Sequence, residues 1–165
     1  MTEPTLHLLC GKMAAGKSTL AARLAAESGG VLLAEDAMTA ALWPGELTSI
    51  AAYADRSERL KRVIWPIVMT FLQTGVSVVL DFPANTPKQR LRLRELIHGS
   101  GAAHVLHVLD AADSVCLARL RARNAEGVHP FAPTEADFHA FTKFFTPPMP
   151  DEGFNVRVWP DAAEA

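Results

Sequence analysis

Eight consecutive residues near the N-terminus, Gly11 to Ser18, have types and spacing that suit the binding of phosphate groups. They read GKMAAGKS and match the pattern G-x-x-x-x-G-K-S/T in full. The two fixed glycines let the backbone turn tightly, so that successive N–H groups aim at phosphate oxygens. An apolar run precedes the pattern and a helical one follows it, as a phosphate-binding loop requires. The residues predicted to bind nucleotide are Gly11, Lys12, Met13, Ala14, Ala15, Gly16, Lys17, Ser18 and Thr19.

Two side chains of this loop have separable predicted roles. The ammonium group of Lys17 should reach the β- and γ-phosphates, and the hydroxyl of Ser18 should ligate Mg²⁺. The helix that begins at Lys17 adds unpaired N–H groups and the positive end of its dipole. The sequence contains no guanine-reading N-K-x-D motif. We therefore expect ATP with Mg²⁺ rather than GTP.

Two carboxylates follow predicted strands and would meet this loop at the carboxyl edge of a sheet. Asp81 comes directly after the apolar run 76–80 and is predicted to hold Mg²⁺, through water; the alternative is a loop-capping aspartate. Asp36 follows the run 31–34 by two residues. It is predicted to accept the proton of an acceptor hydroxyl, or to orient that hydroxyl. The alternative is a helix N-cap before residues 37–42, with Glu35 as the fallback carboxylate.

Arg119 and Arg123 are four residues apart and share one face of a predicted helix, whose buried side contains Cys116, Leu117 and Leu120. Two guanidinium groups on one face suit the charge of a transferring phosphoryl group. One of them stacking on adenine is an alternative, and so is a pair that only covers the helix. The predicted catalytic residues are Lys17, Asp36, Arg119 and Arg123.

The elements that must position these residues alternate between strand and helix along the chain. Apolar runs predict strands at 6–10, 31–34, 76–80, 103–109 and 154–158. Helical patterns cover 17–28, 37–42, 47–74, a segment capped by Thr86-Pro87, 113–125 and a short segment from Thr134. Pro66 lies inside the longest of these and should kink it. This order predicts an α/β fold with a parallel sheet covered by helices on both faces.

Length and composition are those of one domain spanning residues 1–165, with frayed ends at 2–4 and 160–165. The formal net charge is −2, and most of the 16 basic residues lie in the stretches 56–62, 88–94 and 119–123. Solvated helix faces explain such stretches, unless a few of them meet phosphates. Both cysteines lie in apolar runs and are expected to be reduced and buried. Without a membrane-length apolar run or a signal peptide, we expect a cytoplasmic protein that does not bind membranes.

Four segments together resemble the small P-loop kinases of the nucleoside-kinase-like group. They are GKMAAGKST, the aspartate of LLAEDAM, the strand VVLD and the stretch CLARLRARN. This group includes zeta-toxin-like, chloramphenicol-phosphotransferase-like and polynucleotide-kinase-like members. The resemblance covers most of the chain and implies a three-layer α/β/α P-loop NTPase fold, with a five-stranded parallel sheet and a small lid at about 119–134. It also implies a strand-2 aspartate as base and lid arginines on the phosphates, which here are Asp36, Arg119 and Arg123.

The phosphoryl acceptor is the least determined part of this hypothesis. We expect transfer of the γ-phosphoryl of ATP to a hydroxyl of a small molecule; a nucleic-acid 5′ end is less favoured because the chain is slightly acidic. A nucleotide-dependent switch or ATPase without an acceptor is the second class, and the chain could be a monomer or a homodimer. Segments that could contact an acceptor are 43–44, 56–62, 129–131 and the phenylalanines 138, 141, 144 and 145, although a packed helix face also explains those phenylalanines.

Overall fold

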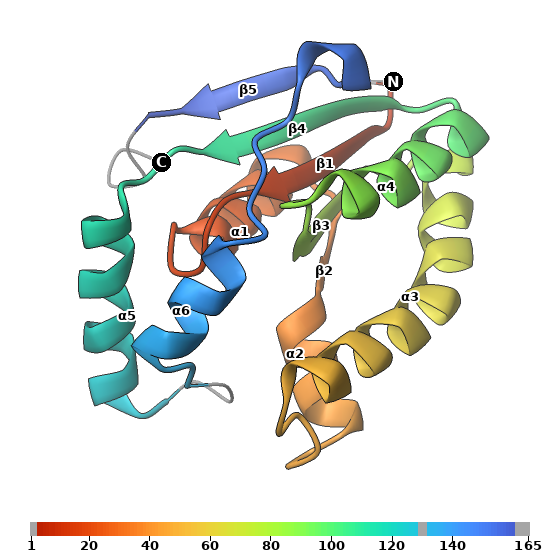
Figure 1. Ribbon diagram of the computed structural model, residues 1–165. Helices are drawn as coiled ribbons and strands as arrows, with labels where there is room; N and C mark the ends of the chain where they lie inside the picture. Colours follow the sequence, from red (N-terminus) through yellow and green to blue (C-terminus); the bar gives the residue numbers. More distant parts are fainter. Residues whose placement is uncertain (1–2, 129–131, 161–165) are drawn as a thin grey trace.

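The fold is built on one parallel sheet (Figure 1). The computed structural model describes residues 3–128 and 132–160. The strands of the sheet are β1 (Thr5–Cys10), β2 (Val31–Ala34), β3 (Val78–Pro83), β4 (Ala103–Leu109) and β5 (Val156–Trp159). They pair in parallel in the order β2-β3-β1-β4-β5. The strand that leads into the phosphate-binding pattern is therefore the central one, and the predicted five-stranded parallel sheet is confirmed.

Six helices and a short 3₁₀ turn connect the strands. They are α1 (Lys17–Ser28), α2 (Glu35–Leu42), α3 (Ile50–Gln73), α4 (Pro87–Ser100), α5 (Asp113–Glu126), α6 (Glu135–Thr142) and η1 (Pro150–Glu152). Helices α3 and α4 pack on one face of the sheet, and α1, α5 and α6 contribute to the core on the other. Within the described residues, no helix combines the length and apolar character needed to cross a membrane.

Strand β1 shows how the sheet fills both layers of core. Leu6 and Leu8 pack among residues of α3 and α4. Leu9, the next residue toward the loop, packs among residues of α1 and α5. All three are at most 1% exposed. Side chains alternate between the two faces of a strand, so a central strand buried on both faces is apolar at most positions; the exceptions in β1 are Thr5 and His7, and His7 hydrogen-bonds His107 at 3.1 Å. That pattern fixes β1, and with it the position of the loop that follows.

Local capping signals set several helix ends as predicted. Thr86 and Gln89 form a reciprocal capping box at the start of α4, and Thr134 and Asp137 form another at the start of α6. Helix α3 continues without interruption through Pro66 and curves around the sheet in Figure 1. Cys10 and Cys116 are buried and unpaired, as expected for reduced thiols.

Several element boundaries differ from the sequence prediction; among them, helix α3 begins at Ile50 rather than at residue 47. Helix α2 begins at Glu35 rather than at residue 37, and β5 covers 156–159 rather than 154–158. Strand β3 begins at Val78 and runs to Pro83, so Asp81 lies within it and pairs in register with Ala34 of β2. The ladder with β2 and β1 holds the backbone extended beyond the last apolar residue of the run, which the apolar pattern alone does not reveal.

Two buried polar residues tie the C-terminal segment to the sheet. Arg90 of α4 is 0% exposed and is an exception in its basic stretch, where Lys88 and Arg92 are exposed as expected of a solvated helix face. The Arg90 guanidinium donates to both carboxylate oxygens of Glu152, at 2.7 and 2.9 Å, and to the carbonyl of Thr146 at 2.8 Å. His107 of β4, 1% exposed, accepts a hydrogen bond from the indole of Trp159 at 3.2 Å.

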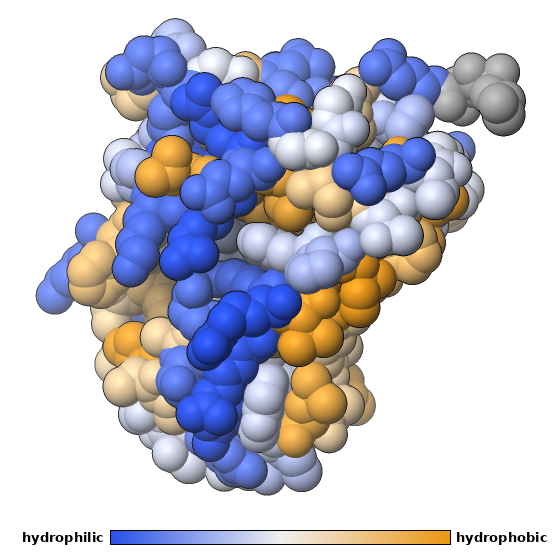
Figure 2. Space-filling view, turned by 90° about the vertical axis from the view of Figure 1, so that its right-hand side faces the viewer, coloured by the Kyte–Doolittle hydropathy of each residue, from blue (hydrophilic) through white to orange (hydrophobic). Residues whose placement is uncertain are grey.

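The face formed by α3 and α4 has mixed character. Hydrophilic and hydrophobic side chains are interspersed on the side of the molecule that Figure 2 shows. Exposed apolar residues of these helices include Val63, Ile67 and Leu91. Scattered apolar side chains of this kind are ordinary on a protein surface and do not by themselves indicate an interface.

Candidate active site

The loop between β1 and α1 has the backbone shape that anion binding requires. Ala14 and Gly16 adopt left-handed conformations, with φ of 59° and 101°, and so turn successive N–H groups toward one concave side. At Gly11 a Cβ atom would lie 3.2 Å from Cβ and 3.3 Å from the carbonyl oxygen of Leu109, so a larger residue would force the loop away from β4. The Gly11 amide donates to the side-chain oxygen of Asn85 at 2.8 Å, which fixes the loop against the end of β3.

The remaining loop residues anchor or flank this backbone. Ala15 is fully buried, and Met13 and Ala14 pack against the same core cluster. Lys12 forms an ion pair with Asp113 at 2.5 Å, which ties the loop to the start of α5. Thr19 is exposed in the first turn of α1. The side chains of residues 12–15 thus anchor the loop to its surroundings. Backbone amides of the loop other than those of Gly11 and Ala15, which are bonded to Asn85 and to the carbonyl of Lys12, provide its contacts to a ligand.

Lys17 lies across the loop that it follows. Its ammonium group donates to the carbonyl oxygens of Gly11 at 2.6 Å and Lys12 at 2.8 Å. Burial lowers the pKa of Lys17, while the nearby negative charges of Asp81 and Asp36 act to raise it. A lysine desolvated in this way and held by two carbonyls is positioned to exchange these weak acceptors for phosphate oxygens.

Ser18 and Asp81 meet at the same edge of the sheet. The Ser18 hydroxyl donates to a carboxylate oxygen of Asp81 at 2.7 Å, across 63 residues of sequence. A hydroxyl and a carboxylate are hard oxygen ligands of the kind that Mg²⁺ prefers. Among the described residues no group of three or more His, Cys, Asp or Glu side chains could hold a metal ion. This small donor set fits an ion that takes most of its ligands from phosphate and water, as Mg²⁺ does in nucleotide sites.

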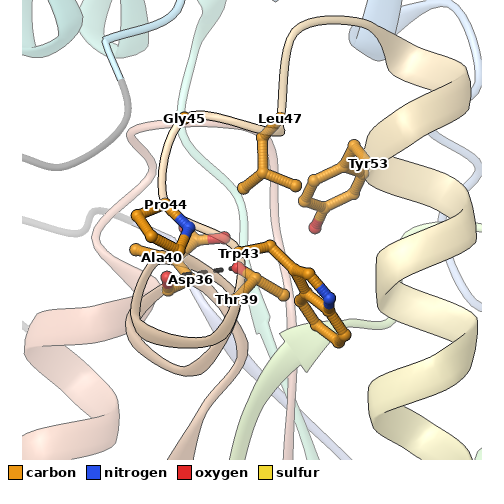
Figure 3. A pocket seen from close by; sticks show the side chains of 8 residues that line it. All are labelled: Asp36, Thr39, Ala40, Trp43, Pro44, Gly45, Leu47 and Tyr53. Carbon is orange, nitrogen blue, oxygen red and sulfur yellow. Dashed lines mark hydrogen bonds between the residues drawn. The ribbon is translucent and has the colours of Figure 1, made fainter.

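Asp36 lies in the first turn of α2, beside Asp81 and the loop. The N-cap of α2 is Ala34, which makes no side-chain cap bond, so the alternative of Asp36 as a helix cap is wrong. Asp36 lines a cavity of about 280 Å³ (Figure 3). Burial by the surrounding protein raises its pKa, with further increases from Glu35 and Asp81; Lys17 and Arg123 act in the opposite direction. The residue as a whole is nevertheless exposed to solvent.

Glu35 has a structural role that the sequence did not reveal. Its side chain is 1% exposed, and its two carboxylate oxygens accept from the hydroxyls of Tyr53 and Ser57, each at 2.5 Å. Lys61 lies 3.9 Å away. Burial, followed by the charge of Glu35, raises the pKa of Tyr53 well above its usual value. The carboxylate therefore fastens α2 to α3, which makes it a poor substitute for Asp36 as a base. The only local signal is the four-residue spacing of the three partners on α3.

The two arginines of α5 both face this edge of the sheet. Arg119 donates to the carbonyl oxygen of Ala15 in the loop at 3.5 Å. The positive charge of Arg123 acts to lower the pKa of Asp36, against the larger effects that raise it. The Nε atom of Arg123 is buried and has no hydrogen-bond partner within the described part of the chain. A buried guanidinium N–H of this kind is costly unless an acceptor reaches it, and phosphate oxygens are suitable acceptors.

The cavity beside Asp36 lies between the end of α2 and the start of α3. It is lined by Asp36, Thr39, Ala40, Trp43, Pro44, Gly45, Leu47 and Tyr53. A smaller hollow of about 100 Å³ adjoins it through the shared residues Leu47 and Tyr53 and extends to Phe141 of α6. Trp43 and Pro44 thus form a wall of this cavity, and their contact with an acceptor stays a prediction.

Other segments proposed to contact an acceptor have different positions. Arg56 lies over the ring of Trp43 at 5.6 Å and pairs with Glu46 and Asp55. Phe138 is fully buried, whereas Phe144 is 65% exposed. Phe145 packs against the core cluster under α3 and α4. Residues 129–131, and with them part of the proposed lid at 119–134, lie outside the described residues.

Comparison with known proteins agrees with this geometry. A family model described as an AAA domain matches residues 6–148. No curated protein sequence matches the chain. Among solved structures, a candidate kinase from Chloroflexus aurantiacus J-10-fl superposes with a TM-score of 0.74 and 23% identity, covering 96% of this chain and 86% of that one.

Two further solved structures share the fold. A gluconokinase from Sinorhizobium meliloti 1021 has a TM-score of 0.64 and 17% identity, covering 99% of this chain and 88% of that one. The Mycobacterium tuberculosis APS kinase CysC, solved with AMPPNP and APS, has a TM-score of 0.63 and 19% identity, covering 99% and 96%. At these identities the likeness establishes a common P-loop kinase fold.

Proposed function

The chain belongs to the AAA-domain family, and from that premise we propose that it is an ATP-dependent phosphotransferase acting on a hydroxyl group of a small molecule. One observation carries the proposal. Asp36 lines a cavity of about 280 Å³ and at the same time lies within the electrostatic reach of Lys17 and Asp81. A carboxylate placed between a phosphate-binding loop and a separate cavity is what transfer to an acceptor needs, and simple hydrolysis needs no such cavity.

In the proposed reaction the loop and the basic side chains hold the phosphates. The loop N–H groups other than those of Gly11 and Ala15, which donate to Asn85 and to the carbonyl of Lys12, bind the β- and γ-phosphates of ATP together with the ammonium group of Lys17. Ser18 and Asp81 would hold Mg²⁺, which neutralises part of the phosphate charge. Arg119 and Arg123 approach from α5 and stabilise the charge that spreads over the transferring group.

Asp36 handles the proton of the acceptor. As the hydroxyl oxygen attacks the γ-phosphorus, its proton passes to the carboxylate of Asp36, and the bond to the β-phosphate oxygen breaks to release ADP. The raised pKa of Asp36 brings it closer to neutral pH, which improves a carboxylate as a base. Helix α2 supplies the positioning, because Glu35, one residue earlier, locks this turn onto α3.

The test is transfer of labelled phosphate from ATP to a library of hydroxyl compounds. Asp36→Asn should reduce transfer by roughly 10²–10⁴-fold, the usual size of a general-base contribution, and leave ATP binding nearly intact. Asp151→Asn, an exposed carboxylate in η1, is the matched control and should transfer normally. Formation of ADP and free phosphate with every compound would instead support a nucleotide switch and overturn the proposal.

A further inference from the structure

The cavity beside Asp36 has an unusual balance of charge for a site that is to accept a phosphoryl group. Of the residues that line it, Asp36 alone is charged, and it is negative. Arg56 is basic and contacts the outer wall at Trp43, but its guanidinium is paired with Glu46 at 2.5 Å and Asp55 at 2.8 Å. Within the described part of the chain, the lining therefore offers no cation to an anionic acceptor.

Apart from the indole N–H of Trp43, the polar side chains of the lining have no proton to give to a ligand. The Tyr53 hydroxyl gives its proton to Glu35, and the Thr39 hydroxyl gives its proton to the backbone carbonyls of Glu35 and Asp36, the latter drawn as a dashed line in Figure 3. Thr39 is 0% exposed, so the lone pairs that a ligand can reach are those of the Tyr53 hydroxyl. Together with the Asp36 carboxylate, they select a ligand that donates, such as one bearing hydroxyl groups.

The rest of the lining is apolar and fits a small ring. Leu47 from the loop and Tyr53 from α3 lie side by side over the cavity, and Trp43 and Pro44 close it from the α2 side (Figure 3). A cavity of about 150 Å³ holds benzene. The volume of about 280 Å³ found here has room for one substituted ring, with its flat face on these apolar walls.

We propose that the acceptor is a single-ring compound that bears a hydroxyl group and no negative charge, and that anionic acceptors such as nucleotides, sugar acids and sugar phosphates are discriminated against. The proposal rests on the phosphotransferase function above. Lys17 and Arg123 act on the Asp36 carboxylate but are not among the residues that line the cavity. The discrimination arises from the Asp36 carboxylate, which would repel an anion in a pocket without a compensating cation.

Three para-substituted benzyl alcohols of similar size and different charge test the proposal: 4-(hydroxymethyl)benzamide, 4-(hydroxymethyl)benzoate and 4-(aminomethyl)benzyl alcohol. Ligand-observed NMR with the full chain measures their dissociation constants, with a fluorescent ATP analogue used in parallel to measure nucleotide binding. The uncharged amide should bind at least about tenfold more tightly than the benzoate, and the cationic amine should also bind more tightly than the benzoate. Binding of the benzoate as tight as or tighter than that of the amide, or failure of all three to bind, would overturn the proposal.

A charge placed in the wall provides a second test. Leu47→Lys puts an ammonium group in the lining and should reverse the preference, improving benzoate binding by about tenfold or more. Leu42→Lys is the matched control, because Leu42 is 58% exposed and does not line the cavity. The control should keep the preference of the parent chain. A Leu47→Lys chain that still rejects the benzoate would contradict the charge argument.

The two proposals fail in different ways. Preferential binding of the amide without any phosphoryl transfer would refute the phosphotransferase function and leave the selectivity of the cavity standing. Transfer to anionic members of a hydroxyl library would refute the selectivity and leave the phosphotransferase function standing. Nucleotide binding, followed with the fluorescent analogue, shows in each case that the loop is intact.

Discussion

At the scale of single residues, Lys17 joins the loop backbone to the negative charges around it. Its two carbonyl contacts, at 2.6 and 2.8 Å, hold the ammonium group over the loop. Lys17→Ala removes a charge that follows the developing charge of the transition state, so phosphoryl transfer should become undetectable. The measurement is single-turnover transfer of labelled phosphate. Lys143→Ala, which removes an exposed lysine after α6, should transfer normally; near-parental transfer by Lys17→Ala would disprove the assignment of the nucleotide site.

Asp36 allows a prediction about pH. Its pKa is raised above the ordinary value of 3.8, chiefly by burial, and a base must be deprotonated to act. Activity should therefore be present above this raised pKa and be lost as pH falls through it. The acidic limb of kcat/KM plotted against pH should lie above 3.8 and should disappear from the residual activity of Asp36→Asn. An acidic limb that persists unchanged in this variant belongs to another group.

At the scale of elements, the join between α2 and α3 sets the shape of the cavity. Glu35→Ala removes the carboxylate that accepts from Tyr53 and Ser57 and leaves both hydroxyls without it. The free energy of unfolding in urea should fall by about 1–3 kcal/mol, the cost of stranding buried polar groups. Because α2 also holds Asp36, kcat should fall as well. Glu58→Gln, an exposed carboxylate on α3, is the control and should change the unfolding free energy little.

Local signals explain which elements the sequence could predict. The caps at Thr86 and Thr134 and the apolar runs of β1 and β4 are written in neighbouring residues, and the structure confirms them. The contact of Ser18 with Asp81 was also foreseeable, because carboxyl ends of parallel strands meet at one edge. The hydrogen bonds that Glu35 accepts from Tyr53 and Ser57 were not foreseeable, since these partners come from another helix whose placement depends on the whole sheet.

At the scale of the whole molecule, His107 links stability to pH. It accepts from the Trp159 indole, and burial, with smaller contributions from His7 and two arginines, lowers its pKa to about 4. The unfolded chain takes up this proton near pH 6.5, but the folded chain takes it up only near 4. Stability is therefore complete above pH 6.5 and decreases as pH falls toward 4.

Urea unfolding at different pH values tests this linkage. Between pH 6.5 and 5 the unfolding free energy should fall by about 2 kcal/mol, at 1.36 kcal/mol per unit. His107→Leu should be less stable at neutral pH, because Trp159 loses its acceptor, yet it should show a shallower loss on acidification. His98→Gln, exposed on α4, should keep the parental slope. An equally steep loss in His107→Leu would assign the effect to other groups.

The bond network of Arg90 has a consequence for shortened versions of the chain. The side-chain oxygen of Asn85 accepts from the Gly11 amide, and its backbone carbonyl accepts from the amide of Thr146. The phosphate loop and the C-terminal segment are therefore both held by Asn85. The family match ends at residue 148, before Glu152. A truncation at that point would keep every residue of the site but remove Glu152 from the Arg90 guanidinium, which would retain only carbonyl acceptors; breaking a buried ion pair in this way costs about 3–5 kcal/mol. The smallest fragment that folds stably is thus longer than the span of the sequence motifs.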